Sequence, residues 1–160
     1  MHKIALTDLQ QQFPADFYQG LSMFGALSAD CLKFLLEQGT AWYADSDDSL
    51  FIEGDNSDKF YVVLSGSISF FQAKESGSDK VFIRRYQAGE QVGFVGMIGL
   101  HQRRGDAVMA DSGYLLEVSS DLFHQLCDKF PQMFQIFLIN IAREMSREIS
   151  HLDQMHAEKS

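Results

Sequence analysis

The spacing of hydrophobic residues changes twice along the chain, from helical at the start to alternating in the middle and back to helical at the end. Up to residue 37 the apolar positions recur every three or four places, as they do on one side of a helix. Thr7, followed three places later by Gln10, has the pattern of a capping box, and Ser28 precedes a second run of helical spacing. The sequence therefore predicts helices within residues 5–37.

Short apolar or alternating runs, separated by Gly, Asn, Asp and Ser, occupy the middle of the chain. In residues 67–70 and 80–84 apolar and polar side chains alternate, which is the period of a strand with one buried face. Many short strands with turn residues between them are typical of a barrel or a jelly roll. We therefore expect residues 40–118 to form a barrel or a jelly roll, which the family resemblance given below specifies as a β-roll.

Helical spacing returns over residues 119–156. Ser119 or Ser120 is suited to cap a short helix, and Pro131 to begin a long one. In its second half the long helix narrows to one apolar stripe, made of Leu138, Ile141, Met145, Ile149 and Leu152. Because a long exposed apolar stripe is costly in a monomer, the stripe predicts a homodimer through this helix. The alternative is that it only docks the helix on the roll, within a single domain of residues 1–160.

The amino-acid composition of the chain indicates which kinds of binding partner are disfavoured. The chain has 13 Lys and Arg residues against 22 Asp and Glu residues, a net charge of −9 and no basic run, which disfavours direct binding of nucleic acid. A local pocket for a small anion remains compatible with that charge. The N-terminus lacks the apolar core of a signal peptide, no run has the length of a membrane span, and Cys31 and Cys127 match no metal or disulfide spacing. We expect a cytoplasmic protein.

Residues 50–68 resemble the cyclic-nucleotide-binding domain family, which includes the catabolite activator and the regulatory subunits of cyclic-AMP-dependent kinase. The segment is similar to the family's strand, Gly-Asp turn at Gly54, second strand with an aromatic pair, and Gly66 followed by a small residue. The similarity extends over about 21–152, with one departure at Asp47, where the family has Gly. It implies a mainly β fold, a jelly-roll β-roll (double-stranded β-helix) with N-terminal helices and a long C-terminal helix.

Residues 92–108 resemble the family's phosphate-binding cassette. In that cassette a Glu after a Gly holds the ribose hydroxyl, and a later Arg pairs with the cyclic phosphate. Gly93 matches the Gly, but Phe94 falls on the Glu position. Arg104 falls on the Arg position, with Arg103 as the alternative register, and Asp106 falls where the family keeps Ala. The resemblance implies a ligand site made of Gly93, Phe94, Val95, Gly96, Met97, Arg104, Gly105 and Asp106.

The departures predict an altered pocket. Phe94 cannot accept hydrogen bonds from ribose hydroxyls, and losing such a bond to a charged group costs roughly ten- to a hundredfold in affinity. We expect Phe94 to fill the vacated pocket as a core plug, with a stacking platform for a flat ligand as the alternative. Asp106 is expected either to repel a phosphate or to pair with Arg104 and neutralise it.

These features predict a regulatory or sensor domain of the cyclic-nucleotide-binding type, with an altered cassette, that signals through its C-terminal helix. Its ligand would be a cyclic nucleotide (cyclic AMP or cyclic GMP) or another small anion. The alternatives are a ligand-free dimerisation or protein-interaction module and a true cyclic AMP sensor with an unusual pocket. Because the sequence stops at Ser160 without a helix-turn-helix, output is expected through a dimer or a separate partner. We expect no catalytic residues, and no metal site, because nothing completes the pair His124 and Cys127.

Overall fold

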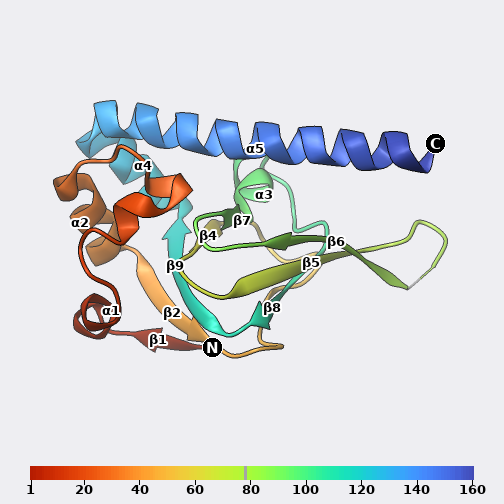
Figure 1. Cartoon of the computed structure of the whole chain (residues 1–160), viewed down its shortest axis with the longest axis horizontal. Coiled ribbons are helices and arrows are strands. Elements are labelled where there is room, and N and C mark those ends of the chain that lie inside the picture. The colour runs from red at the N-terminus through yellow and green to blue at the C-terminus, as the bar shows by residue number, and fades with distance from the viewer. Residues whose placement is uncertain (78) are drawn as a thin grey trace.

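The N-terminal segment packs its helices against one end of the roll (Figure 1). This computed structural model describes residues 1–77 and 79–160. The segment consists of β1 (His2–Ile4), α1 (Leu6–Gln12), the 3-10 helices η1 (Tyr18–Gly20) and η2 (Ser22–Phe24), and α2 (Ala29–Gln38). Ser28 Oγ accepts a hydrogen bond from the Cys31 N–H at 3.2 Å, so Ser28 caps α2 as predicted. Ala5, and not Thr7, is the N-cap of α1, so the predicted capping box does not form.

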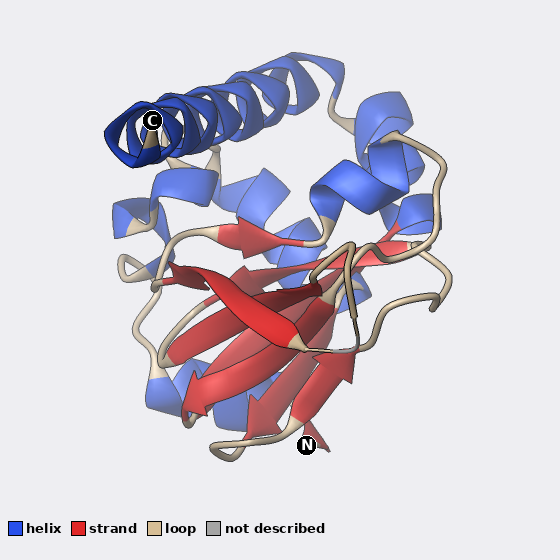
Figure 2. Ribbon diagram, turned by 90° about the vertical axis from the view of Figure 1, so that its right-hand side faces the viewer, coloured by secondary structure: helices blue, strands red, loops and turns tan. Residues whose placement is uncertain are grey.

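The roll consists of two antiparallel sheets that face each other (Figure 2). The first sheet has the order β1, β2 (Thr40–Ala44), β9 (Gly113–Ser119), β4 (Lys59–Val63) and β7 (Gln91–Val92). The second has the order β3 (Ser49–Phe51), β8 (Asp106–Asp111), β5 (Ser67–Ala73) and β6 (Lys80–Tyr86). Strand β4 is buried on both faces: Phe60 and Val62 join the core beneath the helices, while Tyr61 and Val63 point into the roll.

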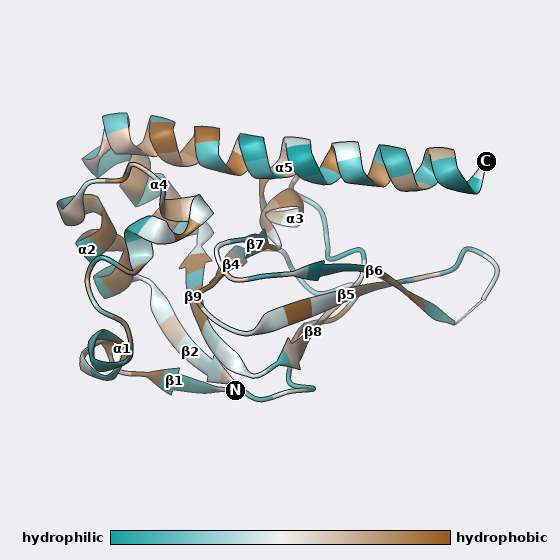
Figure 3. Cartoon of the chain, in the orientation of Figure 1, coloured by the Kyte–Doolittle hydropathy of each residue, from teal (hydrophilic) through white to brown (hydrophobic). Residues whose placement is uncertain are grey.

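Three helices follow or interrupt the roll. The short helix α3 (Phe94–Ile98) lies between β7 and β8, and α4 (Ser120–Lys129) begins at the predicted cap, where Ser119 Oγ accepts from the Leu122 N–H at 3.1 Å. Helix α5 (Pro131–Lys159) has 29 residues, about 44 Å at 1.5 Å per residue, and crosses the whole molecule (Figure 1). Its first half carries more apolar residues than its second half (Figure 3).

The expected fold class is confirmed: a mainly antiparallel β-roll with N-terminal helices and a long C-terminal helix. Gly54 and Gly66 adopt the left-handed backbone that their turns require, with φ of 90° and 82°. Asp47, which departs from the family's Gly, also has a left-handed φ of 73°, a conformation that Asp tolerates better than most residues. Two differences are strand β1, which the pattern does not predict, and α5, which continues to Lys159. None of the helices in the described ranges could cross a membrane.

Candidate ligand-binding site

A cavity of about 410 Å³ lies between α3, the interior of the roll and the second half of α5. Residues from all three regions form its wall. The cassette and its loop contribute Gly93, Val95, Gly96, His101, Arg103 and Arg104; the roll contributes Phe51, Phe70, Gln72, Ile83, Tyr86, Gln91 and Val92; and α5 contributes Glu148 and Leu152. The cavity therefore joins the predicted cassette to the long helix.

Two glycines allow Arg103 and Ser57 to lie directly against α3. Gly93, with φ of 99°, begins the helix, and a Cβ atom there would lie 2.7 Å from Nη1 of Arg103. A Cβ atom at Gly96 would lie 2.6 Å from Ser57 Oγ and 3.4 Å from the same Nη1. Because any side chain at Gly93 would also be strained at this φ, the cassette accommodates Arg103 only when Gly occupies this position.

Arg103 is a buried cation, with 4% of its surface exposed. Its Nη1 donates to the Gly93 carbonyl at 2.7 Å, its Nη2 donates to the Lys59 carbonyl, and its guanidinium lies 4.2 Å from the ring centre of Phe51. Within residues 1–77 and 79–160 no carboxylate lies within 4.0 Å of it, and Nε has no hydrogen-bond partner. Burial lowers the pKa of this guanidinium. Carbonyl dipoles, an aromatic ring and longer-range charges that include Asp58 and Asp55 favour the charged guanidinium, which has no direct ion pair in the described ranges.

Arg104, which the cassette resemblance assigns to the phosphate, lines the same cavity but is exposed. The two possible alignments of the cassette place Arg104 or Arg103 at the phosphate position. Both residues line the cavity, but Arg103 is buried and Arg104 is exposed. Arg103 is fixed by backbone carbonyls, whereas no ion pair within 4.0 Å involves Arg104 in the described ranges. Sequence spacing alone could not separate them, because the difference lies in contacts with Lys59 and Phe51.

Phe94 points away from the cavity, into the core beneath the helices. It is 4% exposed and packs edge-on against Phe60 and Phe123, with ring centres 5.4 Å and 5.5 Å away. Its N–H donates to Gln91 Oε1 at 3.0 Å. Met97, one turn later on α3, joins the same core and is also absent from the cavity wall. The expectation that Phe94 fills the vacated pocket is therefore wrong. Phe94 is a core residue, but it belongs to the core beneath the helices and not to the cavity.

Asp106 and Gly105 also lie outside the cavity wall. Asp106 Oδ1 accepts from the Glu53 N–H at 2.8 Å, and Oδ2 pairs with Lys80 on β6. Burial would raise the pKa of Asp106, but these two hydrogen bonds and the Lys80 charge outweigh it and lower the pKa. The expected pair with Arg104 is wrong, because the β5–β8 register sets Asp106 beside Phe71 and brings Lys80 within reach. Gly105 is needed because a Cβ atom there would lie 2.3 Å from the Phe71 carbonyl oxygen.

Two glutamates of α5, which lie outside the predicted apolar stripe, attach the helix to the roll. Glu148 accepts from Tyr86 Oη at 3.3 Å and pairs with Arg84 at 3.2 Å, and Arg84 also pairs with Glu90 at 2.6 Å. Glu144 is 2% exposed, and its Oε1 accepts from the Gln91 N–H at 2.9 Å. Gln91 in turn accepts from the first residue of α3, so hydrogen bonds run from α5 to the cassette.

The predicted apolar stripe of α5 divides into buried and exposed positions. Ile141 is 1% exposed and belongs to the main core, so it is not available to a partner in this arrangement. Leu138, Ile149 and Leu152 are 37%, 57% and 38% exposed, and Met145 is half-buried against the core. Leu152 also lines the cavity beside α3, so Leu138 and Ile149 are the exposed members of the stripe outside the cavity wall.

The structure is thus an antiparallel β-roll that carries a short helix beside a cavity and is closed by a long C-terminal helix. A model of the family described as "Cyclic nucleotide-binding domain" matches residues 42–130, more than half of the chain. The chain belongs to the cyclic nucleotide-binding domain family. A search of curated proteins finds no match.

Solved structures with the same fold include a cyclic nucleotide-binding domain from Methylobacillus flagellatus, with a TM-score of 0.84 and 19% identity over 99% of this chain and 89% of that one. The catabolite activator protein of Thermus thermophilus has a TM-score of 0.71 and 19% identity, over 85% and 62% of the two chains. The regulatory domain of Toxoplasma gondii PKA, solved with cAMP, has a TM-score of 0.66 and 16% identity, over 86% and 51%. At these identities the similarity shows the fold.

Glu144 makes the stability of the protein depend on pH. Burial raises the pKa of its carboxyl to about 7, against an ordinary value of 4.5. Between these two values the folded chain binds more protons than the unfolded chain, so the free energy of unfolding falls as the pH rises through this window and stays lower above it. Glu144→Gln keeps the acceptor for Gln91 and removes the charge. We expect the variant to be more stable than the native chain by about 3 kcal/mol at pH 8, with the difference closing towards pH 4.5.

Urea unfolding from pH 4.5 to pH 8 measures this difference. Glu158→Gln, at an exposed position near the end of the same helix, is the control and should follow the native curve. A constant gap between Glu144→Gln and the native chain across this range would show that Glu144 does not titrate there.

Proposed function

We propose that this chain is a regulatory sensor domain that binds a small phosphorylated ligand, of which a cyclic nucleotide is the first candidate, and signals through α5. The observation that carries the proposal is the buried guanidinium of Arg103, which lies on the cavity wall with no carboxylate beside it in the described ranges. A buried charge without a direct ion pair is costly, and an anion in the cavity would offset that cost.

Arg104 supports the same conclusion. Its exposed guanidinium lies at the same cavity and can donate two parallel hydrogen bonds to a phosphate. The net charge of −9 opposes an approaching anion, but charges more than about 8–10 Å away are largely screened at physiological salt. Two arginines in one cavity therefore dominate the local field.

The coupling to α5 follows from the composition of the cavity wall. Glu148 and Leu152 belong both to α5 and to the wall, so a ligand there contacts the helix directly. A ligand that changes the contacts of Glu148 with Arg84 and Tyr86 shifts the balance between positions of α5. The output then passes through a dimer or a separate partner.

A second candidate function is a ligand-free dimerisation module on the same scaffold. The exposed apolar residues Leu138 and Ile149 of α5 favour it. The two functions are compatible, since a dimer through α5 would also transmit a signal from the cavity. A cytoplasmic location and the lack of catalysis remain predictions; the unpaired thiols of Cys31 and Cys127 agree with the former.

Calorimetry with cyclic AMP and cyclic GMP tests the phosphate site. We expect micromolar binding to the native chain and a roughly ten- to hundredfold loss in Arg104→Ala, because a hydrogen bond to a charged group contributes about 1.5–3 kcal/mol. Arg147→Ala removes an exposed arginine of α5 that does not line the cavity, and it should leave the affinity unchanged. If neither nucleotide binds, the ligand-free module is favoured; if both variants lose affinity equally, Arg104 is not the contact.

The ligand's ribose provides a separate prediction. Among the described wall residues Glu148 supplies the one carboxylate, and it is already bonded to Arg84 and Tyr86. We therefore expect 2′-deoxy cyclic AMP to bind within about threefold of cyclic AMP, since no free carboxylate accepts from the 2′-hydroxyl. Competition between the two nucleotides on the native chain measures the ratio. A preference of tenfold or more for the ribose form would place an unrecognised acceptor in the cavity.

The oligomeric state tests the exposed apolar residues Leu138 and Ile149 of α5. We expect a dimer whose dissociation constant rises at least tenfold in Leu138→Asp and Ile149→Asp, because each change places a charge in an apolar interface. Ser146→Asp adds the same charge at an exposed position outside the stripe and should leave the dimer intact. Sedimentation equilibrium measures all three variants beside the native chain, and a monomer at every concentration would contradict the prediction.

A further inference from the structure

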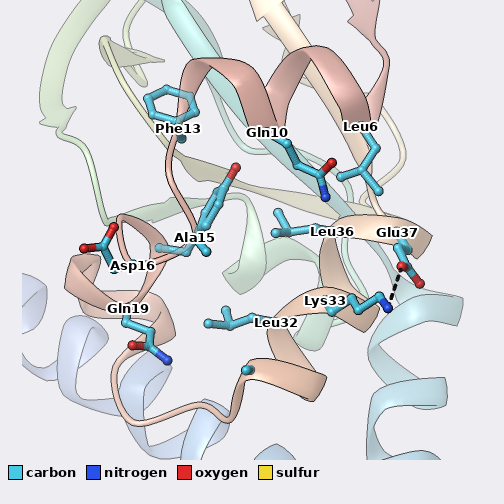
Figure 4. Close-up of a pocket in the computed structure, with 12 residues that line it drawn as sticks. Leu6, Gln10, Phe13, Ala15, Asp16, Gln19, Leu32, Lys33, Leu36 and Glu37 are labelled. Carbon is cyan, nitrogen blue, oxygen red and sulfur yellow. Dashed lines mark ion pairs between the residues drawn. The ribbon is translucent and has the colours of Figure 1, made fainter.

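A second cavity, of about 600 Å³, lies between α1, the turn that leads into η1, and α2 (Figure 4). It shares no wall residue with the cavity beside α3. Figure 4 shows Leu6 and Gln10 of α1 on one side and Leu32 and Leu36 of α2 on the other, with the space between them. The two helices are close in space because both pack on the main core, through Leu9 and Leu35.

The floor of this cavity is apolar. Its edge is polar, and the charged side chains there carry no net positive charge. Phe13 and Leu32 are 8% and 5% exposed and form part of the floor. At the edge, Lys33 and Glu37 pair at 3.8 Å, which leaves Asp16 as the remaining charged wall residue in the described ranges (Figure 4). An apolar ligand gains from burial here, while an anion would meet Asp16 without a free cation beside it.

Tyr18 adds a specific polar group to the wall. The residue is 3% exposed, and its hydroxyl is buried without a hydrogen-bond partner among the described residues. Buried hydroxyls in proteins are nearly always hydrogen-bonded, so this one lacks an acceptor. Burial raises the pKa of Tyr18, which keeps the phenol neutral and able to donate.

We propose that this cavity binds an uncharged small molecule that has an apolar body and one oxygen acceptor, such as a ketone, ester or amide, and that the oxygen accepts from Tyr18 Oη. The apolar body lies on Phe13 and Leu32. Because the hydroxyl is covered by protein, the ligand reaches it by displacing side chains at the edge, where Gln10 and Gln19 are exposed and have many rotamers. The site is independent of the cavity beside α3.

Three probes of nearly equal size separate the parts of this proposal: acetophenone, which has the carbonyl; ethylbenzene, which lacks it; and benzoate, which is an anion. Backbone amide NMR titrations of the whole chain measure binding and locate it. We expect acetophenone to shift amides of residues 13–19 and 29–37, and to bind roughly five- to tenfold more tightly than ethylbenzene through one neutral hydrogen bond. Benzoate should bind more weakly than acetophenone.

Tyr18→Phe is the decisive variant, because it removes only the hydroxyl. We expect it to abolish the advantage of acetophenone over ethylbenzene and to leave ethylbenzene binding unchanged. Ala29→Phe places a ring in the cavity from an exposed helix position and should block both probes, while Ala157→Phe, exposed at the end of α5, should not. Shifts that map outside the cavity, an unchanged ratio in Tyr18→Phe, or benzoate binding as tightly as acetophenone would each overturn the proposal.

Discussion

The buried guanidinium of Arg103 is the interaction on which the site depends. It bonds to the carbonyl of Gly93 at the start of α3 and to the carbonyl of Lys59 on β4, and it lies over the ring of Phe51 on β3. Three elements that are distant in the sequence are thereby held together around one charge. Gly93 follows from this arrangement, since a side chain there would overlap the guanidinium, while Gly96 leaves room for Ser57. The cassette is shaped by an internal cation before any ligand arrives.

Helix α3 separates two environments. Its Gly93 and Gly96 face the cavity, whereas Phe94 and Met97 face the core formed with β4, α4 and α5. This division follows from helical spacing, because residues three apart lie on the same side. A shift of α3 towards the cavity would therefore pull Phe94 from its contacts with Phe60 and Phe123, so the cavity and the helical core are mechanically connected.

Hydropathy and turn residues such as Gly54 and Gly66 were sufficient to predict the helical ends and the strands of the middle segment, because these depend on local periodicity, whereas the family resemblance identified the β-roll and the position of the cassette. The roles of single cassette residues depend on contacts between distant strands. Asp106 pairs with Lys80 because of the sheet register, and Arg103 is buried because Lys59 and Phe51 lie beside it. Glu144 was unpredictable for the same reason: spacing alone marks it as solvent-facing, while β7 offers it an N–H in the interior.

The two halves of α5 are attached to the roll in different ways. Phe137 and Ile141 bury the first half in the main core, where displacement would expose apolar surface. Beyond Ile141, Met145 still packs against the core, and the other attachments are the hydrogen bonds and ion pairs of Glu144 and Glu148, which water or a ligand can replace at lower cost. The cavity meets α5 only in this second half, among the described wall residues. The proposed ligand would therefore act on the half of the helix that has fewer apolar contacts with the core, while the first half stays buried.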